Sequence, residues 1–226
     1  MAVRVEIISI GTLARNPFWG ETGSVRPSHA TTTLIRDGET NLLVDPSVPA
    51  ELMAHRLDER VGLRPEQIDR VFLTSFRPVH RRSIALFKEA EWLLAEAERE
   101  AVNAHLNALV RGSDGGEIET SYEELSEELE LLGRTQAAGD KLTPSVHLFP
   151  SPGVTPGSTA LLIAEERTAI VAGDAIITRE HYEQGRVFER CVNHDAARES
   201  FLAISEVADL IVPGHGNLFL ADRQFE

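Results

Sequence analysis

The sequence contains a single cysteine, Cys191, few aromatic residues and no long hydrophobic run. A lone cysteine excludes both an intramolecular disulfide and a cysteine-rich metal site. No stretch reaches the about 18 apolar residues of a membrane span, and the apolar N-terminal segment is too short for a signal peptide. We therefore expect a cytoplasmic protein with no membrane contact.

Positive charge is also scarce. The 226 residues include 22 Lys and Arg against 36 Asp and Glu, a formal net charge of −14. Because an acidic surface repels a phosphate backbone, nucleic acid is not expected as a partner, which leaves a small molecule or another protein. No Pro-, Gly- or Ser-rich linker divides the chain, so we expect one domain over residues 1–226.

Short apolar segments bounded by turn residues predict strands near both ends of the chain. These segments cover residues 3–10, 31–35, 41–46, 70–74, 146–150, 160–164, 168–172 and 210–213. The Asp37-Gly38 pair predicts a hairpin that places Asp45 at the end of its second strand. Helical spacing predicts helices over 49–61 and 195–208, the latter capped by Asn193 or Asp195.

The middle of the chain favours helices. Apolar spacing over residues 83–110 predicts a long amphipathic helix or helix pair, ended by the break at 113–116. Residues 117–132 contain seven glutamates and a leucine stripe, which is typical of a surface helix. The stripe needs a partner, so this helical insertion, about 93–142, is expected to shape a pocket or a homodimer surface. Two β-rich halves around it predict a mixed α/β layered sandwich.

Four loops at predicted strand ends contain the residues best suited to chemistry, as is usual in α/β enzymes. They are the segments 73–80, 151–159, 171–174 and 212–216. In this order the loops resemble the metal-binding motifs of the metallo-β-lactamase superfamily: a His-x-His-x-Asp-His loop, a PGHTPGS turn, a GD strand end and a PGH turn. The resemblance implies an α/β (α+β) fold, the four-layer αββα sandwich. It also implies that the insertion lies over the mouth of the site.

The resemblance covers three of the seven ligand positions. His80, Asp174 and His215 match the motifs, whereas other residue types stand at the remaining positions: Ser75, Arg77, Val79 and Val154. Members of the superfamily hold two zinc ions. Three histidines hold the first, and their counterparts here, Ser75, Arg77 and Val154, are not normal zinc ligands. The resemblance places Val79, His80 and His215 at the second site and Asp174 at the position that bridges both metals. The resemblance therefore implies a degenerate motif in which His80, Asp174 and His215 hold one zinc or iron ion, or none.

The side chain of Arg77 decides between these alternatives. If its guanidinium points inward, it takes the place of the cation and pairs with Asp174. If it points to solvent, the three-ligand site stays open. The first case predicts a pseudo-hydrolase with a binding, regulatory or structural role. The second predicts a mononuclear metal-dependent hydrolase acting on an ester, thioester or lactam-like bond.

Further residues permit two interpretations each. Phe18 and Trp19 line a substrate pocket or cover the edge of the sheet, and Arg179 and Arg186 recognise an anion or only balance the acidic surface. Asp45 resembles an early aspartate of the superfamily and is expected to have a structural role.

Overall fold

The structure is a computed structural model that describes residues 3–112 and 121–221. The strands of its first sheet come mostly from the N-terminal half of the chain. Its strand order is β1-β2-β3-β4-β5-β6. The strands are β1 (Arg4–Ser9), β2 (Thr32–Asp37), β3 (Thr40–Val44), β4 (Arg70–Leu73), β5 (Glu91–Leu94) and β6 (Gln136–Ala137). β1 to β3 pair antiparallel and β3 to β6 pair parallel, which brings the carboxyl ends of β3 and β4 together.

The second sheet has the order β12-β11-β10-β9-β8-β7. Its strands are β7 (Lys141–Thr143), β8 (Val146–Pro150), β9 (Thr159–Ile163), β10 (Ala169–Gly173), β11 (Leu210–Pro213) and β12 (Phe219–Leu220). β10 and β11 pair parallel, whereas the other neighbours are antiparallel. The GD and PGH motifs therefore leave the sheet side by side.

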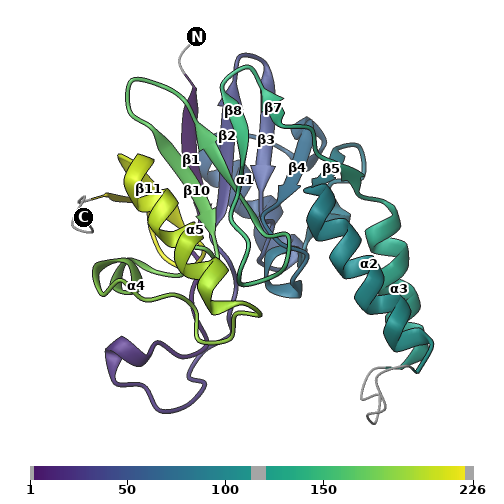
Figure 1. The fold of residues 1–226 in the computed structure, drawn as a ribbon. Helices are drawn as coiled ribbons and strands as arrows, with labels where there is room; N and C mark the ends of the chain where they lie inside the picture. The colour runs from purple at the N-terminus through teal and green to yellow at the C-terminus, as the bar shows by residue number, and fades with distance from the viewer. Residues whose placement is uncertain (1–2, 113–120, 222–226) are drawn as a thin grey trace.

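Helices cover the outer face of each sheet, so the expected αββα sandwich is confirmed (Figure 1). The helices are α1 (Ala50–Val61), α2 (Glu96–Val110), α3 (Tyr122–Gly133), α4 (Arg179–Glu183) and α5 (His194–Val207). One apolar cluster lies between α1 to α3 and the first sheet, a second between the two sheets, and a third between the second sheet and α4 and α5. None of the described helices is long and apolar enough to cross a membrane.

The prediction of helix over residues 83–110 is wrong before Glu96, because residues 84–86 form only a 3-10 turn and residues 91–94 form β5. Trp92 and Leu94 lie in the cluster under the helices, whereas Leu93 lies between the sheets, so alternate side chains face opposite ways. Only a strand does this. The error arose because a run buried on both faces lacks the apolar-polar alternation that distinguishes a strand from a helix.

The helical insertion is smaller than expected and has its partner within the chain. Its helices are α2 and α3, and the expected range of 93–142 also includes residues of β5, β6 and β7. Leu125 and Leu132 are buried in the cluster on the first sheet, and Leu129 packs against it. The leucine stripe therefore needs no second chain to cover it. The predicted break at 113–116 lies outside the described residues.

Candidate functional site

The carboxyl ends of β3 and β4 form the lower part of the site. Asp45 directly follows β3 and has a left-handed backbone, with φ 51°, a conformation that aspartate tolerates better than most residues. Its Oδ1 accepts the backbone N–H of Thr74 at 2.9 Å, and its Oδ2 accepts the Thr74 hydroxyl at 2.7 Å. Asp45 thus ties two strand ends together, the structural role expected of it.

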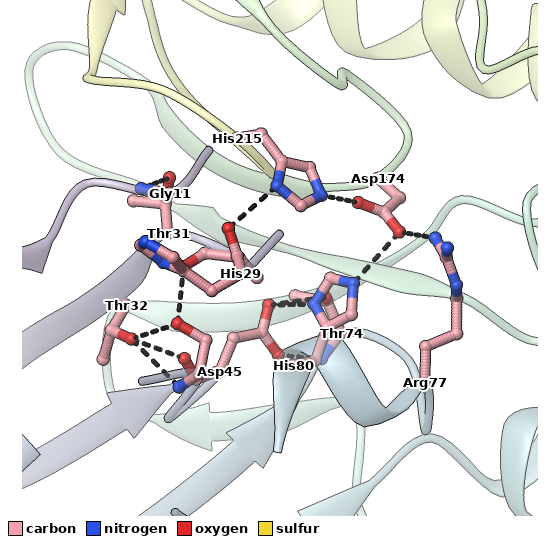
Figure 2. Close-up of polar contacts among 12 residues, drawn as sticks. Gly11, His29, Thr31, Thr32, Asp45, Thr74, Arg77, His80, Asp174 and His215 are labelled. Carbon is pink, nitrogen blue, oxygen red and sulfur yellow. Dashed lines mark hydrogen bonds and ion pairs between the residues drawn. The ribbon is translucent and has the colours of Figure 1, made fainter. Parts of the chain in front are cut away.

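His80 connects this pair to the second sheet. It ends a short 3-10 turn, Pro78–His80, and is fully buried. Its Nδ1 lies 2.9 Å from Oδ2 of Asp45, and its Nε2 lies 3.0 Å from Oδ2 of Asp174 (Figure 2). Because both partners are carboxylates, which only accept, both ring nitrogens donate and His80 is an imidazolium.

Asp174 is the point at which the predicted residues meet (Figure 2). Its Oδ2 accepts from His80 and also from Arg77 Nη1, while its Oδ1 lies 3.3 Å from Nε2 of His215. The structure thus brings His80, Asp174 and His215 together, with the guanidinium of Arg77 pointing inward. We call Asp45, Arg77, His80, Asp174 and His215 the polar cluster.

Two glycines make this approach feasible. Gly173, before Asp174, has φ 53°, and a Cβ there would lie 2.5 Å from the Thr74 hydroxyl oxygen. A Cβ on Gly214, before His215, would lie 2.7 Å from Oδ1 of Asp174. Any larger residue at either position would displace the neighbouring polar group.

Charge and burial oppose each other in the cluster. Burial disfavours the charged form of His80, but the carboxylates of Asp174 and Asp45 outweigh it and raise the pKa of His80 to about 10. Burial likewise disfavours the charged form of Asp174, yet the adjacent His80 and His215 hold the pKa of its carboxyl well below the usual value. The site is therefore an array of ion pairs in which both groups are charged at neutral pH.

This array predicts a decline in stability at alkaline pH. The pKa of His80 is about 10 in the folded protein and about 6.5 in an unfolded chain. Unfolding therefore releases a proton between these values, and the stabilisation present below pH 6.5 is lost as the pH rises towards 10. We expect the free energy of unfolding to fall by about 2 kcal/mol from pH 7 to pH 9.

Urea unfolding at a series of pH values measures this decline. His80→Gln, which cannot titrate, is expected to be less stable than the wild type at pH 7 and to lack the slope. Equal slopes in the two proteins would assign the decline to other groups.

His215 is fixed from the side opposite Asp174. Its Nδ1 lies 2.9 Å from the carbonyl oxygen of His29 and 3.1 Å from that of Thr12. Carbonyl oxygens only accept, so this nitrogen has the proton. The backbone of the loop after β1 therefore orients His215, a contact between distant segments that no sequence motif indicates.

Ser75 and Val154 stand at two further metal-ligand positions of the superfamily motifs. Ser75 is buried, and its Oγ has no hydrogen-bond partner among the described residues. Val154 is buried as well. The sequence did not predict the role of Glu98, a buried carboxylate at the start of α2 that accepts from the Phe76 N–H, the Thr155 hydroxyl and the Gly157 N–H. Glu98 thereby fixes two of the motif loops to the insertion.

Residues 25–215 match the family model of the metallo-beta-lactamase superfamily. The chain belongs to this superfamily. No curated protein sequence matches it.

Solved structures of superfamily proteins are similar to the chain in fold. AidC, a dizinc quorum-quenching lactonase, has a TM-score of 0.68 at 15% identity over 84% of this chain and 74% of its own. AbOPH, a hydrolase of the beta-lactamase superfamily, has a TM-score of 0.68 at 15% identity over 99% of this chain and 95% of its own. A mutant of AiiA from B. thuringiensis, with N-decanoyl-L-homoserine bound at the active site, has a TM-score of 0.64 at 18% identity over 94% of this chain and 92% of its own. At these identities the likeness establishes the fold alone.

The arrangement of the cluster does not fit a metal ion of the superfamily. The bridging position, Asp174, pairs with the guanidinium of Arg77. Among the described residues, no group of three or more His, Cys, Asp or Glu side chains could hold a metal.

Of the other residues singled out from the sequence, Trp19 and Arg179 line a neighbouring pocket, whereas Phe18 and Arg186 are not among its lining residues. The Arg186 guanidinium lies 6.0 Å from the ring centroid of Phe18. Phe18 also meets the ring of His181 edge-on, with the centroids 4.8 Å apart. His181 lies in the short α4 and is buried.

Proposed function

We propose that the protein is a pseudo-hydrolase of the superfamily, in which an ion-pair array takes the place of the dinuclear metal centre and the fold serves a binding, regulatory or structural role. The observation that supports this most directly is the contact between the Arg77 guanidinium and Asp174. The resemblance implies that Asp174 stands at the position of the aspartate that bridges both metals in the superfamily. A permanent cation on this carboxylate neutralises it without any ion.

Three further features support the proposal. Ser75 and Val154 are not zinc ligands, so the first site lacks its histidines. His80 is a buried imidazolium held between two carboxylates. Phe188 lies against Arg77, whose guanidinium carbon is 5.2 Å from the ring centroid, and this contact helps to hold the side chain inward.

A second candidate is a mononuclear metal-dependent hydrolase acting on an ester, thioester or lactam-like bond. One observation favours it: Oδ1 of Asp174 is buried with no hydrogen-bond partner in the described chain, and Nε2 of His215 lies 3.3 Å away. A lactone is a cyclic ester, and the similar AidC is a lactonase. If Arg77 moved away, His80, Asp174 and His215 would remain as a three-residue donor set.

Metal content distinguishes the two functions. The full chain, purified without chelator or affinity-resin nickel and then incubated with zinc, iron or manganese, is expected to retain less than about 0.1 ion per chain by mass spectrometry. His215→Ala is the matched variant and is expected to give the same value. About one ion per wild-type chain, lost in His215→Ala together with hydrolysis of a lactone, would refute the pseudo-hydrolase and establish the second candidate.

A further inference from the structure

A pocket of about 460 Å³ lies beside His215 and is separate from the rest of the polar cluster. Its walls come from the loop after β1, the start of α4 and the segment 215–219. Of the polar cluster, only His215 lines it. The volume is within the usual range for small-molecule sites.

Trp19 forms an exposed but fixed wall of this pocket. Its side chain is 59% exposed, yet its Nε1 donates to Oε1 of Glu180 at 2.9 Å. The guanidinium carbon of Arg26 lies 5.1 Å from the Trp19 ring centroid, and Arg26 is itself held by an ion pair with Glu21. Trp19 and Arg26 both line the pocket, so these contacts fix an aromatic ring in its wall, where it can take part in stacking.

The rest of the pocket combines apolar walls with a second guanidinium, that of Arg179, which is paired with Glu183 as Arg26 is with Glu21. Ile10 and Leu218 contribute apolar surface and are 42% and 37% exposed. The Nε of Arg179 donates to Glu183, whereas its terminal nitrogens have no partner among the described residues. The carboxylate of Glu180 is engaged by Trp19. The pocket wall therefore includes a guanidinium that still has N–H donors for an anionic group.

We propose that this pocket binds a small aromatic carboxylate, with its ring on Trp19 and its carboxylate on Arg179. Stacking and a charge-assisted hydrogen bond then act at two ends of one ligand, which selects for a planar ring bearing an anion. The inference goes beyond the proposed function and does not depend on it, because neither contact involves Arg77, His80 or Asp174.

The two tryptophans of the chain allow a direct test with 2-naphthoate as the probe. In a ¹⁵N–¹H spectrum, Trp19 and Trp92 each give one indole signal, and Trp92 is buried with its Nε1 donating to the Phe87 carbonyl. We expect 2-naphthoate to move the Trp19 signal saturably and to leave the Trp92 signal in place. Trp92→Phe assigns the two signals.

Two comparisons test the role of the charge. The neutral 2-naphthamide is expected to bind about tenfold more weakly than 2-naphthoate. Arg179→Ala is expected to weaken 2-naphthoate binding by a similar factor, whereas Arg198→Ala, an exposed arginine on α5, leaves it unchanged. An unmoved Trp92 signal shows that each variant is folded.

Three results would overturn the proposal. One is a Trp19 signal that does not move at the solubility limit of 2-naphthoate. Another is equal binding of the acid and the amide together with no effect of Arg179→Ala. The third is a mass in light scattering that halves in Trp19→Ala, which would make the Trp19 surface a contact between two copies of the chain.

Discussion

Replacing His80 with alanine is expected to lower the free energy of unfolding by about 3–5 kcal/mol. The side chain is fully buried and contacts two carboxylates, Asp45 and Asp174, which are themselves buried. The variant removes the cation between them and leaves both negative charges out of water. Urea unfolding at pH 7, followed by circular dichroism, measures the loss.

His105→Ala is the matched control because His105 is exposed on α2. Alanine has the higher helix propensity, so this variant is expected to change the free energy of unfolding by less than about 0.5 kcal/mol. A loss below about 1 kcal/mol in His80→Ala would contradict the description of the cluster as buried ion pairs.

Restoring the missing histidines is expected to create a metal site. The variant Ser75→His, Arg77→His and Val154→His supplies the three first-site ligands of the resemblance and removes the guanidinium from Asp174. We expect zinc to rise from less than about 0.1 to about one ion per chain. Mass spectrometry after incubation with zinc and removal of free metal measures the change.

The control keeps the arginine. With Ser75→His and Val154→His alone, Arg77 still pairs with Asp174, so we expect the zinc content to stay close to that of the wild type. A double variant that binds zinc as fully as the triple variant would show that the guanidinium yields to a metal, contrary to the role proposed for it. A triple variant that folds but stays free of zinc would show that the loop backbones no longer have the geometry of a metal site.

Local patterns predicted most of the elements that build the sandwich. The Asp37-Gly38 hairpin is present, with Asp45 following its second strand, and Asn193 caps α5 through a hydrogen bond to the Ala196 N–H. Such features depend on residues close together in the chain, which is why sequence patterns reveal them. β5 was missed because its burial on both faces depends on the sheets around it, and the short β6, β7 and β12 were missed as well.

The sequence predicted which residues form the candidate site but not how their side chains are paired. The motifs place His80, Asp174 and His215 at strand ends that the fold brings together. The direction of Arg77, however, depends on Asp174, 97 residues away. Glu98 likewise resembled any other glutamate of a charged helix, because its three donors come from segments 22 to 59 residues distant.

The polar cluster takes its members from both sheets, which has a consequence for the order of folding. Asp45 and His80 are 35 residues apart, whereas His80 and Asp174 are 94 residues apart and His29 and His215 are 186 apart. Closing a longer loop costs more entropy, so contacts of this kind form late. The N-terminal sheet can pair Asp45 with His80 by itself, but Asp174 gains its partners only when the second sheet docks. We therefore expect sheet docking to be the step at which Asp174 loses its water.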